Sequence, residues 1–214
     1  MQVEIWSDVV CPWCYIGKRR FEAALARFEH RGQVKVVWRS FQLDPRAPKG
    51  GDTSLDEMLA RKYGMSVQQA AATNARVTSL AASEGLDYHL HTARYSTTFD
   101  AHRLIHLAAR QDRQGEMEER LMHAYFTEGA AVDDHDTLMH MAADVGIPTG
   151  EARAVLVSDA FADDVRADEQ RAHEFGIQGV PFFAIDEKYG LSGAQPAETL
   201  QAALERAWAD TGSA

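Results

Sequence analysis

The feature that most constrains this chain is the motif Cys-Pro-Trp-Cys at residues 11–14, which holds its only two cysteines and directly follows an alternating apolar run. The alternation predicts a strand that ends near Asp8, and the helical spacing of Phe21, Leu25 and Phe28 predicts a helix immediately after it. The motif therefore lies at the start of a helix. Two cysteines would rarely take this spacing by chance, so the pair indicates chemistry.

A helix start supplies the physical basis for that chemistry. Backbone N–H groups without helical partners and the helix dipole both stabilise an anion, so we expect Cys11 to be the nucleophilic thiolate. Pro12 removes one donor from the first turn and fixes its geometry. Cys14 lies one turn further on the same face, where its thiol can attack a mixed disulfide on Cys11 and release the product.

Two alternative roles of the motif stay open. A structural disulfide across so short a loop would stabilise the fold little, because the benefit of loop closure shrinks with loop length. A structural zinc ion needs four ligands, and the chain has no second pair of cysteines, so histidines or a second copy of the chain would have to complete the site.

Composition narrows the classes of partner. The 214 residues are 45% hydrophobic, enough to bury a full core as one or two domains, and 22 Lys and Arg stand against 32 Asp and Glu, a net charge of −10. Such a charge repels a phosphate backbone, so we expect no nucleic-acid partner. The N-terminus lacks the pattern of a secretory signal and no apolar run reaches membrane-spanning length, which predicts a cytoplasmic protein outside the membrane. In that compartment the cysteines should be mainly thiols.

Strand and turn signals at the two ends of the chain frame a long helical middle. We expect a second strand over residues 34–41, a helix over 159–175, strands over 182–186 and near 189–192, and a closing helix with Pro196 in its first turn that ends near Ala209. Residues 45–52 have the Pro, Gly and charge content of a linker. The predicted domains are residues 1–50 with 157–214, and residues 51–156.

The middle region contains the start signals of several helices. Ser54 with Glu57 and Ser66 with Gln69 have the spacing of capping boxes, and Pro148 precedes another short helix. Apolar stripes at helical intervals predict a bundle of roughly four to six helices. We interpret the stripes as packing surfaces, one of which could line a substrate groove. Their members are Phe99, Leu104 and Leu107; Met117, Leu121, Met122, Tyr125 and Phe126; Leu138, Met141 and Val145.

The order of these features resembles a known family. The C-P-W-C motif near the start, residues 179–183 (Gly-Val-Pro-Phe-Phe) near the end and the central helices together resemble the DsbA family, an α/β thioredoxin fold interrupted by a large all-helical insertion. Ser7-Asp8 before the motif, Ala-His-Arg-Leu at 101–104 and Ser-Gly-Ala-Gln-Pro at 192–196 resemble its FrnE-like branch. That branch contains dithiol–disulfide oxidoreductases. A sister group contains glutathione-using chromene carboxylate isomerases and kappa-class transferases.

The resemblance implies further site residues. Pro181 would be a cis proline that faces the sulfurs, and Val180 would offer its backbone groups to an extended substrate. Pro12 and Trp13 would also contact substrate, with the Trp13 ring partly exposed as an apolar rim. Thr97 departs from the branch, which commonly has Asn there, whereas Cys11 is retained where the isomerase relatives have serine. The retained cysteine favours redox chemistry.

Two polar clusters lie outside the motif. His102 and His106 are four residues apart on a predicted helix, which is the spacing of metal ligands, but two histidines make an incomplete site and we interpret them as packing or a polar groove wall. His102 could instead stabilise the Cys11 thiolate. The acidic residues at 133–136 and 163–164 have the character of helix starts or solvated surface.

The sequence thus predicts a thiol–disulfide oxidoreductase with Cys11 and Cys14 as catalytic residues, no metal and no organic prosthetic group. Its substrate would be a disulfide or dithiol, either a protein or a small molecule, and glutathione or another small thiol could be a co-substrate. Two alternatives stay open: a glutathione-dependent isomerase or transferase, and a redox-switched module that binds a protein client. An exposed sheet edge or helix face could support a homodimer.

Overall fold

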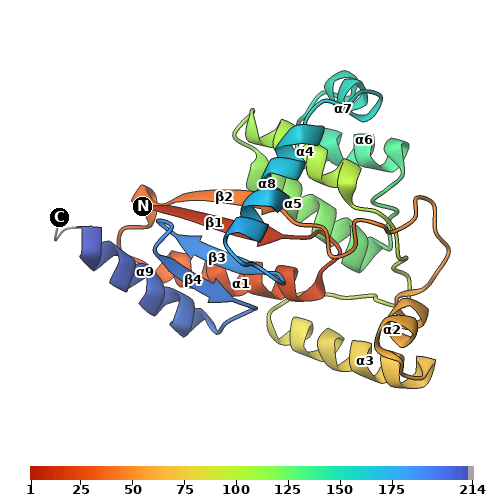
Figure 1. The fold of residues 1–214 in the computed structure, drawn as a ribbon, viewed down its shortest axis with the longest axis horizontal. Coiled ribbons are helices and arrows are strands. Elements are labelled where there is room, and N and C mark those ends of the chain that lie inside the picture. Colours follow the sequence, from red (N-terminus) through yellow and green to blue (C-terminus); the bar gives the residue numbers. More distant parts are fainter. Residues whose placement is uncertain (212–214) are drawn as a thin grey trace. The chain divides into compact units, whose positions relative to one another are not determined.

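A four-stranded mixed sheet in the order β2-β1-β3-β4 organises the two ends of the chain (Figure 1). The computed structural model describes residues 1–211. The strands are β1 (Gln2–Ser7), β2 (Lys35–Ser40), β3 (Phe182–Ile185) and β4 (Tyr189–Ser192). β1 lies between β2, which is parallel to it, and β3, which is antiparallel. The central strand therefore ends at Ser7, just before the cysteine motif.

Helices cover both faces of this sheet (Figure 1). On one face, called the α1 face, α1 (Pro12–Arg27) places the Phe21 ring 5.6 Å from that of Phe183 on β3. The same helix packs against α9 (Ala197–Thr211), which also contacts β4. On the other, the α8 face, the indole of Trp6 donates a hydrogen bond to the Asp168 carbonyl of α8 (Ala162–Glu174) at 3.0 Å. A short helical turn, η1 (Arg31–Gln33), connects α1 to β2.

Alternation along β1 distributes its side chains between those faces. Ile5 pairs in register with Phe183, so the odd-numbered residues of β1 face α1, whereas Trp6 and its even-numbered neighbours face α8. Residues 3–7 are all buried, as expected of a central strand covered on both sides.

The chain divides into two compact units. A sheet unit comprises Met1–Leu43 and Arg166–Ala214, and a helical unit comprises Asp44–Val165. Composition placed the boundaries after residues 50 and 156, so the helical unit begins earlier and ends later than those positions. Its first residues belong to it through short contacts: the Tyr95 hydroxyl donates to Asp44 at 2.5 Å, and the Thr97 N–H donates to the Pro48 carbonyl at 3.0 Å.

The helical unit begins each of its first two helices with a capping box, as predicted. Ser54 accepts from the Glu57 N–H, Ser66 accepts from the Gln69 N–H, and each partner side chain reaches back to the cap. The elements of the unit are α2 (Leu55–Tyr63), α3 (Val67–Ser83), α4 (Phe99–Ala109), α5 (Gln114–His123), the π-helical η2 (Ala124–Glu128), α6 (His135–Asp144) and α7 (Thr149–Leu156). The expectation of an interior built from Met and aromatic stripes is confirmed, since Met117, Leu121 and Phe126 are fully buried.

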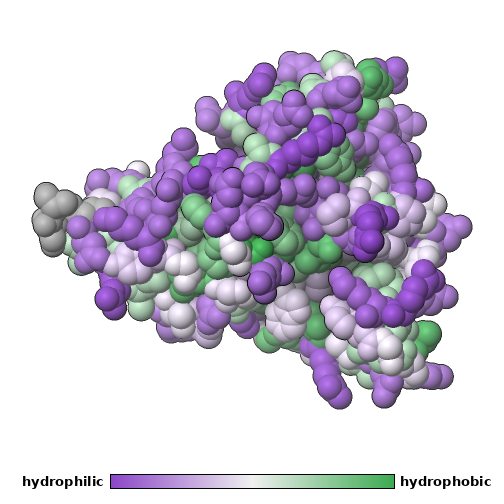
Figure 2. Space-filling model, viewed as in Figure 1, coloured by the Kyte–Doolittle hydropathy of each residue, from purple (hydrophilic) through white to green (hydrophobic). Residues whose placement is uncertain are grey.

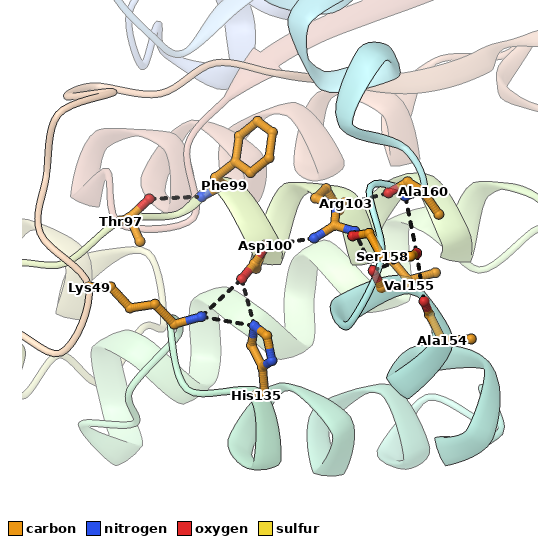
Figure 3. Close-up of polar contacts among 10 residues, drawn as sticks. All are labelled: Lys49, Thr97, Phe99, Asp100, Arg103, His135, Ala154, Val155, Ser158 and Ala160. Atoms are coloured by element: carbon orange, nitrogen blue, oxygen red, sulfur yellow. Dashed lines mark hydrogen bonds and ion pairs between the residues drawn. The ribbon is translucent and has the colours of Figure 1, made fainter.

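A polar network in this unit extends from the buried Arg103 to the surface (Figure 3). Arg103 of α4 pairs with Asp100 at 2.8 Å, and its guanidinium also donates to the carbonyls of Val155 in the last turn of α7 and of Ser158 and Ala160 after it. Asp100 in turn accepts contacts from His135 at 2.8 Å and Lys49 at 3.3 Å. Burial raises the pKa of Asp100, but the hydrogen bonds from His135, Arg103 and Lys49 outweigh it and hold the pKa below its ordinary value.

Some predicted element ends were wrong. α8 starts at Ala162 and not at 159, because Phe161 adopts a positive φ of 63° that a helix cannot contain. β3 ends at Ile185, since Asp186 turns the chain with a φ of 47°. β2 spans Lys35–Ser40, one residue shorter at each end than expected. α9 runs beyond the predicted end near Ala209.

The acidic clusters have different environments. Asp134 caps α6 by accepting from the Thr137 N–H, and Asp163 and Asp164 lie in the first turn of α8, as predicted. The prediction that these acidic residues lie at helix starts or on the solvated surface is wrong for Asp133. This residue is buried and accepts a hydrogen bond from the Gly50 N–H at 2.5 Å.

The described helices include no membrane span. Within residues 1–211 no helix has the length and apolar character needed to cross a bilayer. Hydrophilic residues colour much of the face drawn in Figure 2, including the surface over α8.

Candidate active site

Cys11 occupies the N-cap position of α1, as the sequence predicts. Its backbone is extended (φ −89°, ψ 111°), its side chain makes no capping hydrogen bond, and Pro12 follows at the first helical position. The Cys14 N–H donates to the Cys11 carbonyl at 3.0 Å, which closes the first turn. The capping site that normally holds a hydroxyl or carboxylate is thus occupied by a sulfur.

The two cysteines are both thiols and both buried, whereas Trp13, one of the two residues between them, is exposed. Cys11 and Cys14 are 3% and 1% exposed, and Trp13 is 43% exposed. The expectation that Trp13 is partly exposed is therefore confirmed. Burial raises the pKa of Cys14 well above its ordinary value, and the hydrogen bond and charge of Cys11 raise it further. Cys14 is held as the protonated member of the pair.

The loop before β3 approaches Cys11 closely. The Val180–Pro181 peptide bond is cis, as the family resemblance predicts, and the Cys11 thiol contacts the Val180 carbonyl with an S···O distance of 3.6 Å. The Val180 side chain packs against a buried cluster that includes Trp6. This loop thus presents main-chain groups directly beside the first sulfur.

Gly17 allows that approach. A Cβ at this position of α1 would lie 2.8 Å from Cγ of Pro181, closer than carbon atoms can pack. The absence of a side chain one turn after the motif is therefore a requirement of the site.

Two donors to the second sulfur were not identified from the residue pattern. The Ser7 hydroxyl and the Asp8 backbone N–H both hydrogen-bond Cys14, and both act to lower its pKa against the effects of burial and Cys11. The alternation of β1 contained part of the signal, because it places Ser7 on the same face as Ile5; that this face receives α1 follows only from the structure.

His102, His106 and Thr97, which were singled out from the sequence, lie in the helical unit. His102 is buried in α4, and His106 stacks on the Phe161 ring at 6.4 Å. Among residues 1–211, no group of three His, Cys, Asp or Glu side chains could hold a metal ion. Thr97 accepts a hydrogen bond from the Phe99 N–H at 3.4 Å at the start of α4 (Figure 3). A contribution of His102 to the sulfur chemistry stays a prediction.

The geometry of the sheet unit suits thiol–disulfide exchange. One thiol lies at a helix start beside the Val180 carbonyl, and a second thiol, whose pKa is raised, lies one turn along the same helix; both are buried. Exchange needs a nucleophilic sulfur that a substrate can reach and a second sulfur that attacks only after the first has reacted.

Comparison with known proteins agrees with this geometry. The model of the DSBA-like thioredoxin domain matches residues 2–205. A probable DsbA oxidoreductase from Streptomyces coelicolor is 47% identical, with a TM-score of 0.94 over 98% of this chain and 90% of that one.

Two more distant structures share the fold. The cytosolic disulfide reductase DsbM from Pseudomonas aeruginosa, which has also been solved with GSH, is 17% identical with a TM-score of 0.63 over 96% of this chain and 98% of that one. A 2-hydroxychromene-2-carboxylate isomerase is 13% identical with a TM-score of 0.72 over 100% and 98%. The match to the domain model covers nearly the whole chain, and this chain belongs to the family of proteins with a DSBA-like thioredoxin domain.

Proposed function

We propose that this protein is a thiol–disulfide oxidoreductase that uses Cys11 as nucleophile and Cys14 as resolving thiol. The observation that carries the proposal is the asymmetry of the pair: both sulfurs are buried, but Cys11 lies at the start of α1 beside the Val180 carbonyl, whereas the pKa of Cys14 is raised. The 47% identity to a probable DsbA oxidoreductase supports the same chemistry.

The reaction runs in two exchange steps. The Cys11 thiolate attacks one sulfur of a substrate disulfide, a Cys11–substrate disulfide forms, and the other substrate sulfur leaves as a thiolate. Cys14 then attacks Cys11, and the second substrate sulfur leaves. The proton of Cys14 passes to a departing thiolate. Two electrons reach the substrate, and the pair is left as a Cys11–Cys14 disulfide.

Substrate recognition would use the groups that surround Cys11. The Val180 backbone, next to the cis Pro181, can hydrogen-bond an extended chain on either side of its disulfide. Pro12 and the exposed ring of Trp13 offer an apolar surface next to the sulfur.

Two molecules of a small thiol such as glutathione would return the pair to the dithiol and leave as their own disulfide. In a reducing cytoplasm this makes the protein a reductase of disulfides. The GSH-bound structure of the cytosolic reductase DsbM supports this assignment of compartment and co-substrate. No metal or organic prosthetic group takes part in the proposed cycle.

The first experiment is a measurement of the reduction potential. Purified protein is equilibrated in glutathione and dithiothreitol buffers of known redox potential, and its free thiols are quantified at each potential. A reversible two-electron transition is expected, with a midpoint that fixes the direction of exchange. Cys11→Ser should abolish both the transition and disulfide exchange, whereas Cys14→Ser should accumulate a mixed disulfide on Cys11.

A different result would favour another reaction. If no disulfide forms at any poise, the oxidoreductase proposal fails. Glutathione-dependent isomerase or transferase activity that survives Cys11→Ser would then be the function to assay.

A further inference from the structure

Strand alternation and burial bring a hydroxyl to the second sulfur. Ser7 is the last residue of β1 and lies on its α1 face, which is also the face toward the first turn of α1. Its side chain is 1% exposed, and so is that of Cys14. The hydroxyl hydrogen-bonds Cys14, and the Asp8 N–H, at the next residue, supplies a second hydrogen bond to the same residue.

The electrostatic surroundings of Cys14 change during the proposed reaction. In the dithiol, burial and the neighbouring Cys11 both oppose ionisation of Cys14. Once Cys11 is bonded to a substrate sulfur it carries no charge, so it no longer opposes the ionisation of Cys14. Burial still opposes that ionisation. The donors from Ser7 and Asp8 then remain as the groups that favour a thiolate at Cys14.

We propose that the Ser7 hydroxyl and the Asp8 backbone N–H together form a two-donor site for the Cys14 thiolate and thereby set the rate at which the mixed disulfide on Cys11 is resolved. The inference rests on the proposed function, and it concerns only the second exchange step. In that step the Cys14 thiolate forms the bond to Cys11 and the substrate sulfur departs with the electron pair of the broken bond.

The two steps can be separated in one experiment. The reduced protein is mixed with one equivalent of a chromogenic aromatic disulfide whose leaving thiolate is coloured. Attack by Cys11 releases the first coloured thiolate, and attack by Cys14 on the mixed disulfide releases the second. Stopped-flow absorbance over a range of pH gives a rate for each release.

We expect Ser7→Ala to leave the first release unchanged and to slow the second by about tenfold or more at neutral pH, as for the loss of a hydrogen bond to a charged group. The pH at which the second release reaches half its maximal rate should rise by about one, because the pKa of Cys14 rises when a donor to its thiolate is lost. Above that pH the variant and wild-type rates should converge. A merely structural role of Ser7 would not shift this profile.

Three variants serve as references. Ser7→Thr keeps the hydroxyl and should restore the wild-type profile. Ser40→Ala removes the register neighbour of Ser7 on β2, which is equally buried, and should leave both releases unchanged. Cys14→Ser should show the first release alone.

The outcomes distinguish the two proposals. If the wild-type protein gives no second release, the proposed function fails. If the wild-type protein gives both releases and Ser7→Ala gives them at the same rates and with the same pH profile, the function stands and the role of Ser7 is overturned. Slowing of both releases in Ser7→Ala also overturns it, because the effect is then not specific to Cys14.

Discussion

The two faces of β1 bury polar groups in opposite ways. On the α8 face, Glu4 is 1% exposed and pairs with Arg39 at 2.6 Å and Arg171 at 3.0 Å, while Asp168 pairs with Arg39 at 2.9 Å. On the α1 face the buried polar groups include the hydroxyl of Ser7 and the thiol of Cys14, which is protonated at rest.

This difference shows how one strand can serve stability and chemistry at once. On the α8 face, the buried carboxylates of Glu4 and Asp168 are each paired with an arginine. Without such a partner, a buried charge would strongly destabilise the fold. The α1 face instead holds Cys14, which in the proposed reaction becomes charged only during the second exchange step. Substitutions of the ion-paired residues on the α8 face should therefore reduce stability and leave exchange intact, whereas substitutions beside the cysteines on the α1 face should affect exchange more than stability.

The largest effect is expected from Asp168→Ala. The carboxylate pairs with Arg39 and accepts the Ser40 N–H at 3.0 Å, so its removal leaves the buried Ser40 N–H without its acceptor and the partly buried Arg39 guanidinium with Glu4 alone. The free energy of unfolding, measured in urea, should fall by about 3–5 kcal/mol. Asp164→Ala on the exposed side of the same helix is the control and should change it by about 0.5 kcal/mol or less. An equal loss in both variants would contradict the comparison.

A smaller, pH-dependent effect is expected from Glu4→Gln. Burial raises the pKa of Glu4, but hydrogen bonds from Arg171 and Arg39 outweigh it, and the pKa lies below its ordinary value of 4.5. Because the folded-state pKa is the lower one, the ionised carboxylate stabilises the fold fully above that ordinary value and less as the pH falls through the folded-state pKa.

Glu4→Gln should therefore reduce the free energy of unfolding by about 2–3 kcal/mol at pH 7. The difference from wild type should shrink as the pH falls below 4.5. Urea unfolding of both proteins across this range is the measurement. A difference that stays constant with pH would mean that the charge of Glu4 is not what stabilises this face.

The smallest effect on stability, with a larger one on exchange, is expected from Gly17→Ala. The added methyl would meet Pro181 at 2.8 Å and force α1 away from the loop that carries Val180. Overpacking costs about 1–3 kcal/mol, partly offset by the higher helix propensity of alanine, so we expect a net loss of about 1 kcal/mol. The rate of disulfide exchange should fall more steeply. Gly32→Ala, where a Cβ meets nothing within 4 Å, should change neither property, and a matching loss there would contradict the packing argument.

Local signals account for what the sequence predicted well. The capping boxes at Ser54 and Ser66 and the position of Cys11 at a helix start depend on residues within four positions of one another, so they can be identified from the chain alone. The cis bond at Pro181 was predicted only through the family resemblance, because most bonds that precede proline are trans.

Features that depend on distant segments were not predicted. Asp133 is buried because the chain brings Gly50 to it across 83 residues, and nothing in its own neighbourhood signals that contact. The role of Ser7 depends on which face of β1 receives α1, which the alternation of the strand alone does not decide. In the helical unit, the Arg103 contacts with the end of α7 and the segment that follows it likewise span more than fifty residues of chain (52 to Val155 and 57 to Ala160).

The N-cap of α1 has a consequence for how this active site relates to the stability of the fold. Serine at such a position typically accepts a hydrogen bond from the first turn, and replacing it with a poorer cap costs about 1 kcal/mol. Cys11 makes no such bond. Under the proposed function, a serine at position 11 would therefore give a more stable protein that lacks disulfide exchange, so Cys11 occupies a position where selection for stability alone would favour its loss.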